Sequence, residues 1–437
     1  MHNRARLPFV QIRFKQRKPS GGCRKRVHSD GGAPATAAAA GYAAFVARKS
    51  NLEHLRALDM LASALGCRIA DLAVSGTKDK LAVTSQLVTA RGVEPNAVAA
   101  ASGALEDQGI VVGPAIKVLR HLRLGEHFGN KFVITVRQLA ADSLRASVDA
   151  SLARIAAGGF ANYFGSQRFG GHGSTSSGDR VGRFVLARQW RAAVAALLGP
   201  DPAETHGGAQ AARSCFAAGV ADADLKQALK LMPKHRTRER LMIQALAQFG
   251  AGDFGCKKAL LAVPRAGRTL WLASYSSMLF NRLVDCRIRA GVDVNTGNTG
   301  AVQVGDLVVK AAGEDPAPLT AAEAASGEWA LADVLLPVPG FGSGSVYPSN
   351  AASGLPGSLL AADGLDEKSF RVNELGVSLK AGYRRLVAVP ARLSHTWRRR
   401  GMPPDHGGPH DELILDFELV PGAYATMLVR ELWCGVE

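Results

Sequence analysis

Apolar residues recur at two spacings along this chain, and each spacing predicts a different kind of element. A helix is predicted from Asn51, which can cap it, to Gly66, which suits a left-handed end. A second helix is predicted to begin at Ser143 and a third to surround Trp271. Residues at helical spacing give each helix an apolar face: Leu55, Leu58, Ala62 and Leu65; Leu144, Val148, Leu152 and Ile155; Trp271, Tyr275, Leu279 and Leu283.

Shorter apolar stretches predict strands. In residues 73–89, AVSGTKDKLAVTSQLVT, two such stretches flank a polar turn, which indicates strand, loop and strand. Residues 129–136 have the character of another strand. In residues 413–419 apolar and acidic positions alternate, as in a half-buried strand, and Pro421 and Gly422 then turn the chain into a final helix.

The order of these elements predicts the domain organisation. The first half alternates strands with helices up to a Gly- and Ser-rich stretch near Gly170, after which the chain is largely helical until strands return. We therefore expect an α/β sheet domain in two parts, residues 41–170 and 351–437, interrupted by an inserted helical domain, residues 171–350. Residues 1–40 are basic and then Ala-rich, and are expected to be a disordered tail with some transit-peptide character.

Composition places the chain among soluble globular proteins. It has 437 residues, of which 47% are hydrophobic and 21% charged, and no apolar run of membrane-spanning length. The six cysteines are far apart and form no metal-ligand spacing, which favours a reduced intracellular compartment. The nucleus and the cytoplasm are both candidates, and the basic start keeps an organelle open.

The charge indicates a polyanionic partner. The net charge is +16, and residues 1–28 carry nine Lys or Arg and no acid. Further basic runs lie at residues 234–240 and 392–400, where Trp397 adds an aromatic face. Nucleic acid is the leading partner class, and solvated faces plus a tail are the alternative for any single run.

Asp79 is the candidate for chemistry. It lies in the polar loop between two predicted strands, with Lys78 and Lys80 on either side, and neighbouring cations favour the charged form of a carboxylate. Such a group could attack a sugar or remove a proton from it. The alternative is a turn aspartate that binds only backbone groups.

Several motifs, in order, resemble those of the TruD family of tRNA pseudouridine synthases. Residues 76–86, GTKDKLAVTSQ, are similar to the family signature GxKDxxAVTxQ. Four more stretches match in the same way: 122–132 (LRLGEHFGNKF), 162–170 (NYFGSQRFG), 273–283 (ASYSSMLFNRL) and 421–432 (PGAYATMLVREL). The resemblance covers roughly residues 45–434. It implies an α/β (α+β) catalytic domain with a mixed sheet, interrupted by a mostly helical inserted domain.

The resemblance also assigns roles to single residues. Asp79 falls on the catalytic aspartate, and Asn130 and Phe132 fall on residues that line the uridine pocket. Phe132 would stack on the base, although a strand-core phenylalanine is the alternative. Arg430 by analogy pairs with the aspartate, with an ordinary surface arginine as the alternative. Lys78 and Lys49 are candidate substrate contacts; Lys49 opens the family's Lys-x-Asn stretch, but the threonine expected soon after is missing and His54 stands nearby.

The implied activity is the isomerisation of uridine to pseudouridine in tRNA, classically at uridine 13 in the D arm. The GTKDK form resembles eukaryotic members, so mRNA and other RNAs are further candidate substrates. No cofactor, metal, membrane or obligate protein partner is expected; His406 and His410 lie in a Gly- and Pro-rich loop that suits solvent better than a metal. An inactive RNA-binding protein and a glycosidase are the rival classes, and the latter would need a second carboxylate.

Overall fold

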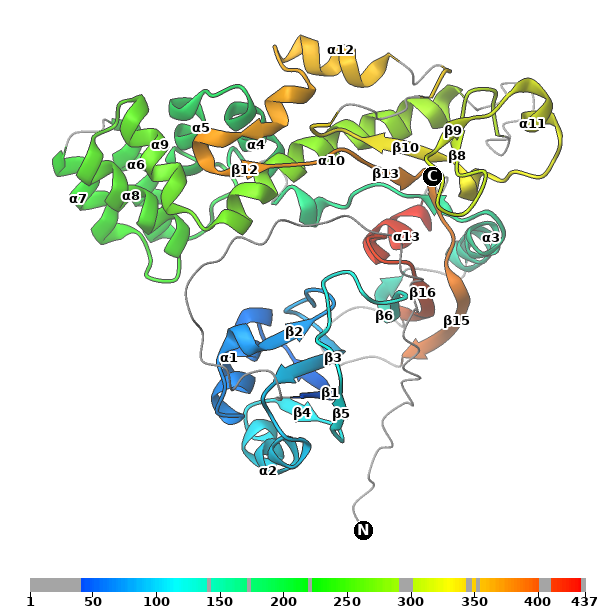
Figure 1. The fold of residues 1–437 in the computed structure, drawn as a ribbon, viewed down its shortest axis with the longest axis horizontal. Helices are drawn as coiled ribbons and strands as arrows, with labels where there is room; N and C mark the ends of the chain where they lie inside the picture. The colour runs from blue at the N-terminus through cyan, green and yellow to red at the C-terminus, as the bar shows by residue number, and fades with distance from the viewer. Residues whose placement is uncertain are drawn as a thin grey trace, which may run out of the picture. The chain divides into compact units, whose positions relative to one another are not determined.

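The computed structural model in Figure 1 describes residues 41–139, 143–170, 174–218, 222–290, 302–342, 348–350, 354–400 and 410–433. The chain forms two compact units that divide between Glu126 and His127. The predicted tail, residues 1–40, and His406 lie outside the described residues.

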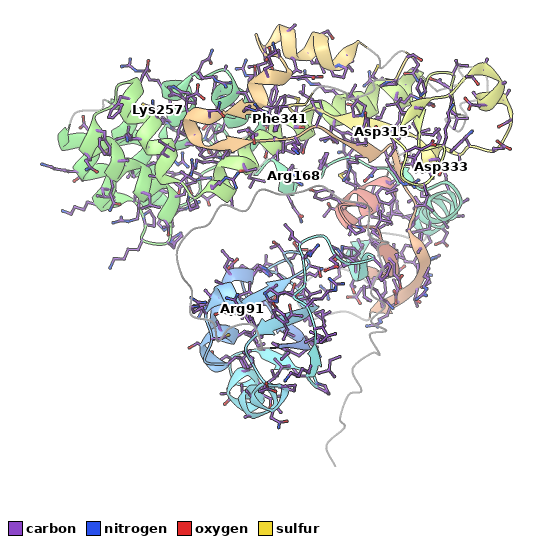
Figure 2. The ribbon with its side chains drawn as sticks, viewed as in Figure 1. Arg91, Arg168, Lys257, Asp315, Asp333 and Phe341 are labelled. Atoms are coloured by element: carbon purple, nitrogen blue, oxygen red, sulfur yellow. The ribbon has the colours of Figure 1, made fainter. Side chains whose placement is uncertain are left out.

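Unit 1 is built on an antiparallel sheet with strand order β2-β3-β1-β4, where β5 also pairs with β1. The strands are β1 (Tyr42–Ser50), β2 (Leu72–Val74), β3 (Val83–Arg91), β4 (Ile110–Val112) and β5 (Ile116–Val118). Helices α1 (His54–Ala64) and α2 (Pro95–Glu106) bury their apolar faces against the sheet, where Phe45, Val88, Leu61 and Leu105 form the core. At the end of β3, Arg91, labelled in Figure 2, forms an ion pair of 2.6 Å with Asp71.

Two features of unit 1 differ from the sequence prediction. Helix α1 begins at His54, because Glu53 and not Asn51 caps it by accepting a hydrogen bond from the Arg56 amide. Asn51 instead has a φ of 50° in the turn that leaves β1. The buried face of α1 includes His54, Ala57 and Leu61, so Leu55, predicted on the apolar face, is 65% exposed. Gly66 ends the helix with a φ of 64°, as predicted. The sequence did not predict β1, whose alanines are poor strand formers.

Unit 2 contains a second antiparallel sheet with order β15-β16-β6. Its strands are β6 (Asn130–Leu139), β15 (Ala391–Arg400) and β16 (His410–Leu419), and helices α3 (Ser143–Gly158) and α13 (Ala425–Glu431) share its core. The strands predicted at 129–136 and 413–419 and the helix from Ser143 are confirmed. Trp397 donates a hydrogen bond to Asp149 of α3, so its ring packs against the helix.

The helical middle of the chain is seen over residues 178–290. The long helix α10 buries Trp271, Tyr275, Leu279 and Leu283, as the spacing predicted. The helices are α4 (Gly178–Leu186), α5 (Trp190–Leu198), α6 (Gly207–Ala218), α7 (Asp222–Leu231), α8 (Thr237–Phe249), α9 (Asp253–Ala262) and α10 (Arg265–Ala290). The domain boundaries expected at residues 170 and 350 stay predictions. The division into two compact units, between Glu126 and His127, is a separate feature.

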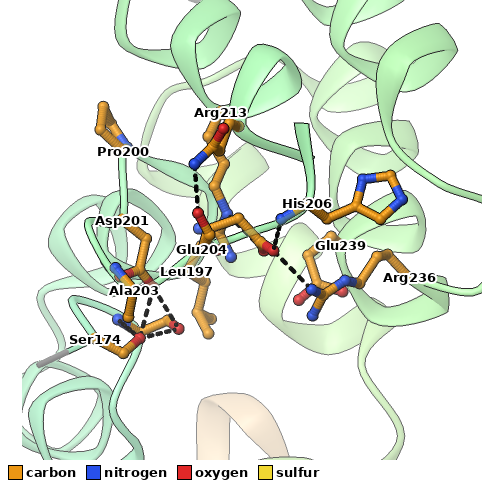
Figure 3. Close-up of polar contacts among 12 residues, drawn as sticks. Ser174, Leu197, Pro200, Asp201, Ala203, Glu204, His206, Arg213, Arg236 and Glu239 are labelled. Atoms are coloured by element: carbon orange, nitrogen blue, oxygen red, sulfur yellow. Dashed lines mark hydrogen bonds and ion pairs between the residues drawn. The ribbon is translucent and has the colours of Figure 1, made fainter. Parts of the chain in front are cut away.

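The basic run of residues 234–240 has intramolecular partners. Arg236 donates a hydrogen bond of 2.8 Å to the buried carboxylate of Glu204, which also faces Arg213 (Figure 3). Arg238 is paired with Glu239, and Arg240 donates to two backbone carbonyls. Arg236 and Arg240 therefore connect this run to other segments of the helical region, which weakens the interpretation of the run as a dedicated RNA surface.

A third sheet, with order β13-β10-β8-β9, follows α10. A buried ion pair joins it to the helix: Arg287 of α10 and Asp306, 1% and 0% exposed, approach to 2.6 Å. The remaining elements are β7 (Phe160–Ala161), β8 (Leu307–Val308), β9 (Ala317–Pro318), α11 (Ala321–Ala325), β10 (Leu335–Val338), α12 (Leu355–Ala362), β11 (Arg371–Val372), β12 (Val377–Ser378), β13 (Gly382–Arg385) and β14 (Val387–Ala388), with short 3-10 helices at Ile69–Asp71, Ser166–Arg168, Leu331–Asp333, Glu367–Phe370 and Asn373–Leu375.

The expected α/β class, with sheets and many helices, is confirmed. One detail is refined: where a mixed sheet was expected, the strand pairs within the described residues are antiparallel, and an isolated bridge between Phe341 and Lys380 is parallel. The sheets therefore form from hairpins and long returns of the chain.

Candidate functional site

The loop that carries Asp79 lies between β2 and β3 and is held at both ends. At its start the Ser75 carbonyl accepts a 2.8 Å hydrogen bond from the Gly125 amide, and at its end the Ala82 carbonyl accepts one of 3.1 Å from the Asn51 amide. Asp79 itself is exposed. The strand, loop and strand of the sequence prediction are therefore confirmed, and they present this carboxylate to solvent.

Lys49 holds the middle of the same loop. Its side chain is almost completely buried, and its ammonium donates hydrogen bonds to the backbone carbonyls of Asp79, at 2.5 Å, and Leu52, at 2.7 Å. Burial lowers the pKa of Lys49, and the nearby Asp79 charge opposes that shift. The Lys49 ammonium is thus directed to the backbone of the candidate aspartate, and its predicted contact with substrate stays a prediction.

Two more basic side chains lie near the loop. Burial lowers the pKa of Lys78, while the Asp79 carboxylate acts in the opposite direction. Burial also lowers the pKa of His54, and Lys49 and Lys78 add to that shift, against Glu53. His54 is buried at the start of α1, and among the residues that the structure describes its Nδ1 has no hydrogen-bond partner. The sequence showed His54 only as a departure from the family motif.

Asn130 and Phe132 lie on β6 in unit 2. The side-chain amide of Asn130 lies 3.5 Å from His127 Nε2. The half-buried ring of Phe132 stacks on Phe417 with centroids 5.5 Å apart. Just before them, a Cβ on Gly129 would lie 2.5 Å from the carbonyl oxygen of Leu419, so only glycine lets the strands approach here. The ring of Phe132 thus has a core neighbour, and its role in a uridine pocket stays a prediction.

Arg430 lies on α13, near the hydrogen bond that Tyr163 donates to Asp285. Burial raises the pKa of Tyr163, as does that hydrogen bond, whereas Arg430 acts to lower it. Arg430 is exposed. Its predicted pairing with Asp79 of unit 1 stays a prediction.

Two family motifs meet at a residue that the sequence did not single out, Arg384. Its guanidinium donates hydrogen bonds to the backbone and side-chain oxygens of Asn162, and lies 4.2 Å from the ring centroid of Phe164 and 5.9 Å from that of Tyr424. Burial lowers the pKa of Arg384 to about 10. Arg168, labelled in Figure 2, lies 5.2 Å from the Phe164 centroid. These motifs therefore have a structural role in unit 2.

Within the described residues, no group of three or more His, Cys, Asp or Glu side chains is arranged to hold a metal ion. None of the helices in that part of the chain is long and apolar enough to cross a bilayer.

The fold and the loop define the class of protein. It is an α/β protein that presents an exposed aspartate on an anchored loop between two lysines. An exposed, held carboxylate is what general-base or nucleophilic chemistry on a substrate requires. The chain belongs to the TruD family, because the family model described as "tRNA pseudouridine synthase D (TruD)" matches residues 27–432. The resemblance noted in the motifs is thereby confirmed.

Individual relatives agree with this family. The chain is 30% identical over 402 residues to "Pseudouridylate synthase PUS7L" of Danio rerio, covering 90% of this chain and 61% of that protein. It is 33% identical over 393 residues to "tRNA pseudouridine synthase D" of Geobacter metallireducens, covering 89% and 87%. The crystal structure of the "Putative tRNA pseudouridine synthase D (TruD)" from Methanosarcina mazei matches with a TM-score of 0.64 and 22% identity, covering 90% and 87%. The chain thus spans about three fifths of the vertebrate relatives' length.

Proposed function

We propose that this protein is an RNA pseudouridine synthase in which Asp79 is the catalytic carboxylate. The observation that carries the proposal is the position of Asp79. It falls on the aspartate of the signature that residues 76–86 resemble, and its loop is exposed while the buried Lys49 ammonium binds the Asp79 carbonyl. A carboxylate held in this way can meet a nucleoside without having to order its loop first.

The reaction rearranges a single nucleoside. The C1′–N1 bond breaks, the uracil turns, C5 bonds to C1′, the C5 hydrogen leaves as a proton and N1 gains one. The balance needs neither water nor an electron donor. Asp79 would attack C1′ covalently or remove a sugar proton to give a glycal, and both routes use the same ionised side chain.

The target base must leave its stack to reach a side chain on the protein. Phe132 would hold it by stacking, and Asn130 would bind its polar edge. The partly exposed ring of Phe132 supports this role, although Phe417 already covers part of it. Arg430 would pair with Asp79, and Lys78 would contact the substrate near Asp79.

The proposed substrate is tRNA, with uridine 13 of the D arm as the first position to examine and mRNA and other RNAs as further candidates. The names of the relatives support tRNA, and the net charge of +16 supports a polyanion. We place the activity inside the cell, in the nucleus, cytoplasm or an organelle. It requires no protein partner in this proposal.

The experiment incubates unmodified tRNA with the wild type, with Asp79→Asn and with Asp59→Asn, and maps pseudouridine chemically. Asp59 is a matched control because it is an exposed carboxylate on α1 of the same unit. We expect pseudouridine with the wild type and Asp59→Asn and none with Asp79→Asn. Equal product from Asp79→Asn, or RNA binding by all three without any product, would contradict the proposal.

A further inference from the structure

Two large apolar side chains are exposed around the Asp79 loop. Leu81, two residues after the aspartate, is 84% exposed, and Leu124 is 83% exposed. Leu124 belongs to this site because its neighbour Gly125 donates the 2.8 Å hydrogen bond to Ser75 at the start of the loop. Single exposed leucines are common on protein surfaces, but two beside one candidate catalytic loop indicate an apolar contact.

Leu81 is exposed on a backbone that is anchored on both sides of it. Before it, the Asp79 carbonyl accepts the hydrogen bond from the buried ammonium of Lys49. After it, the Ala82 carbonyl accepts the hydrogen bond from the Asn51 amide. The loop therefore presents Leu81 at a fixed place relative to Asp79, whereas a leucine on an unanchored loop would sample many positions.

We propose that Leu81 is a wedge that enters the RNA base stack where the target uridine leaves it, with Leu124 as the adjoining apolar contact. This inference rests on the proposed function. Extruding a base costs a few kcal/mol of stacking and pairing. Apolar side chains of nucleic-acid-binding proteins are known to enter base steps and replace such contacts.

The neighbourhood of Leu81 fits RNA better than a protein surface. Lys80 precedes it and is exposed, and Lys78 lies two residues further back, so cations that can meet phosphates lie on one side of the wedge. Position 81 is one of the unspecified positions of the signature GxKDxxAVTxQ. The signature itself therefore does not require a leucine at position 81.

The test measures base extrusion without turnover. Asp79→Asn binds an unmodified tRNA transcript that carries 2-aminopurine, whose fluorescence rises on unstacking, next to uridine 13. The same measurement is made with Leu81→Ala, Leu81→Met and Leu55→Ala, each in the Asp79→Asn background. Leu55 is the control, because it is a leucine of the same unit that is 65% exposed and lies on α1.

We expect binding of Asp79→Asn to raise the 2-aminopurine fluorescence, and the added Leu55→Ala or Leu81→Met change to leave that rise in place. Adding Leu81→Ala should remove most of the rise. With Asp79 intact, Leu81→Ala should lower kcat/KM on the folded transcript by about 10-fold or more, a factor that corresponds to stacking on one base. Melting temperature should stay unchanged, because an exposed side chain has no protein contact to lose.

Three results would overturn the proposal that Leu81 enters the base stack. They are an undiminished fluorescence rise with Leu81→Ala, no rise with any variant, and a lowered melting temperature, which would show that Leu81 packs against protein. Failure of the proposed function is recognised separately, because the wild type would then form no pseudouridine in any RNA, whatever the fluorescence does.

Discussion

Replacing Lys49 with methionine removes the buried ammonium that binds the backbone of the Asp79 loop. The Lys49 ammonium donates to the carbonyls of Asp79 and Leu52, at 2.5 and 2.7 Å, and its side chain is 4% exposed. Methionine fills a similar volume but donates no hydrogen bond, so both carbonyls lose a charged donor. We expect the loop to leave its position while the sheet around it stays folded.

The size of the effect follows from the two contacts. A hydrogen bond to a charged group stabilises by about 1.5–3 kcal/mol. If the substitution releases the hold on Asp79, one such bond corresponds to a loss of roughly 10- to 150-fold in kcat/KM, since 1.4 kcal/mol is tenfold. Lys49→Arg should not restore activity, because its longer, planar fork cannot occupy the position of a compact ammonium.

The assay measures kcat/KM from the release of the C5 hydrogen of uridine in tRNA, alongside urea unfolding. Lys117→Met is the matched control, because Lys117 is an exposed lysine of the same sheet that pairs with Glu94 at the surface. A folded Lys49→Met protein that is as active as Lys117→Met would refute the argument that Lys49 positions Asp79.

Two predictions concern stability. Asp306→Asn should lower the free energy of unfolding by about 3–5 kcal/mol, because it leaves the guanidinium of Arg287 buried without its carboxylate; a loss below about 1 kcal/mol in urea titrations would contradict this. Burial lowers the pKa of His54 from its ordinary value of about 6.5, so the unfolded chain takes up a proton at a higher pH than the folded chain does. The contribution of His54 to the free energy of unfolding is therefore fully present above about pH 6.5, and it is lost as the pH falls towards the pKa of the folded state. His54→Gln should flatten that loss of stability in urea titrations between about pH 5 and 7.5, and an unchanged slope would assign it to other groups.

The sequence predicted correctly those strands in which apolar residues occupy the buried positions and polar residues the exposed ones. Residues 413–419 alternate between a buried and a partly exposed face, so period two predicted β16 correctly. In β1 burial also alternates from Ala47 to Ser50, but the buried positions there carry alanine and Lys49, so the sequence shows no apolar alternation. Pairing with β3 makes this segment a strand inside the sheet. The predicted start of α1 was wrong because asparagine is a preferred N-cap and glutamate is not. The turn after β1 takes up Asn51 with a φ of 50°, and Glu53 accepts the hydrogen bond from the Arg56 amide instead.

The candidate site was predictable in part. The loop around Asp79 follows from two apolar stretches and a polar turn. The role of Lys49 does not follow from the sequence, because it depends on the strand register that places Lys49 opposite Thr84. That register brings the Lys49 ammonium to the carbonyl of Asp79, thirty residues later in the chain. Arg384 was missed for the same reason, since its hydrogen-bond partner Asn162 lies 222 residues away along the chain.

The most direct test of the central claim is the release of the C5 hydrogen from uridine in unmodified tRNA by Asp79→Asn, compared with Asp59→Asn. Asparagine keeps the size of the side chain and removes its charge, so the loop should stay in place while nucleophilic and basic capacity disappear. We predict that Asp59→Asn releases the hydrogen at the wild-type rate and that Asp79→Asn, folded and bound to the same RNA, releases none. Release by Asp79→Asn at the wild-type rate would contradict the assignment of the catalytic carboxylate.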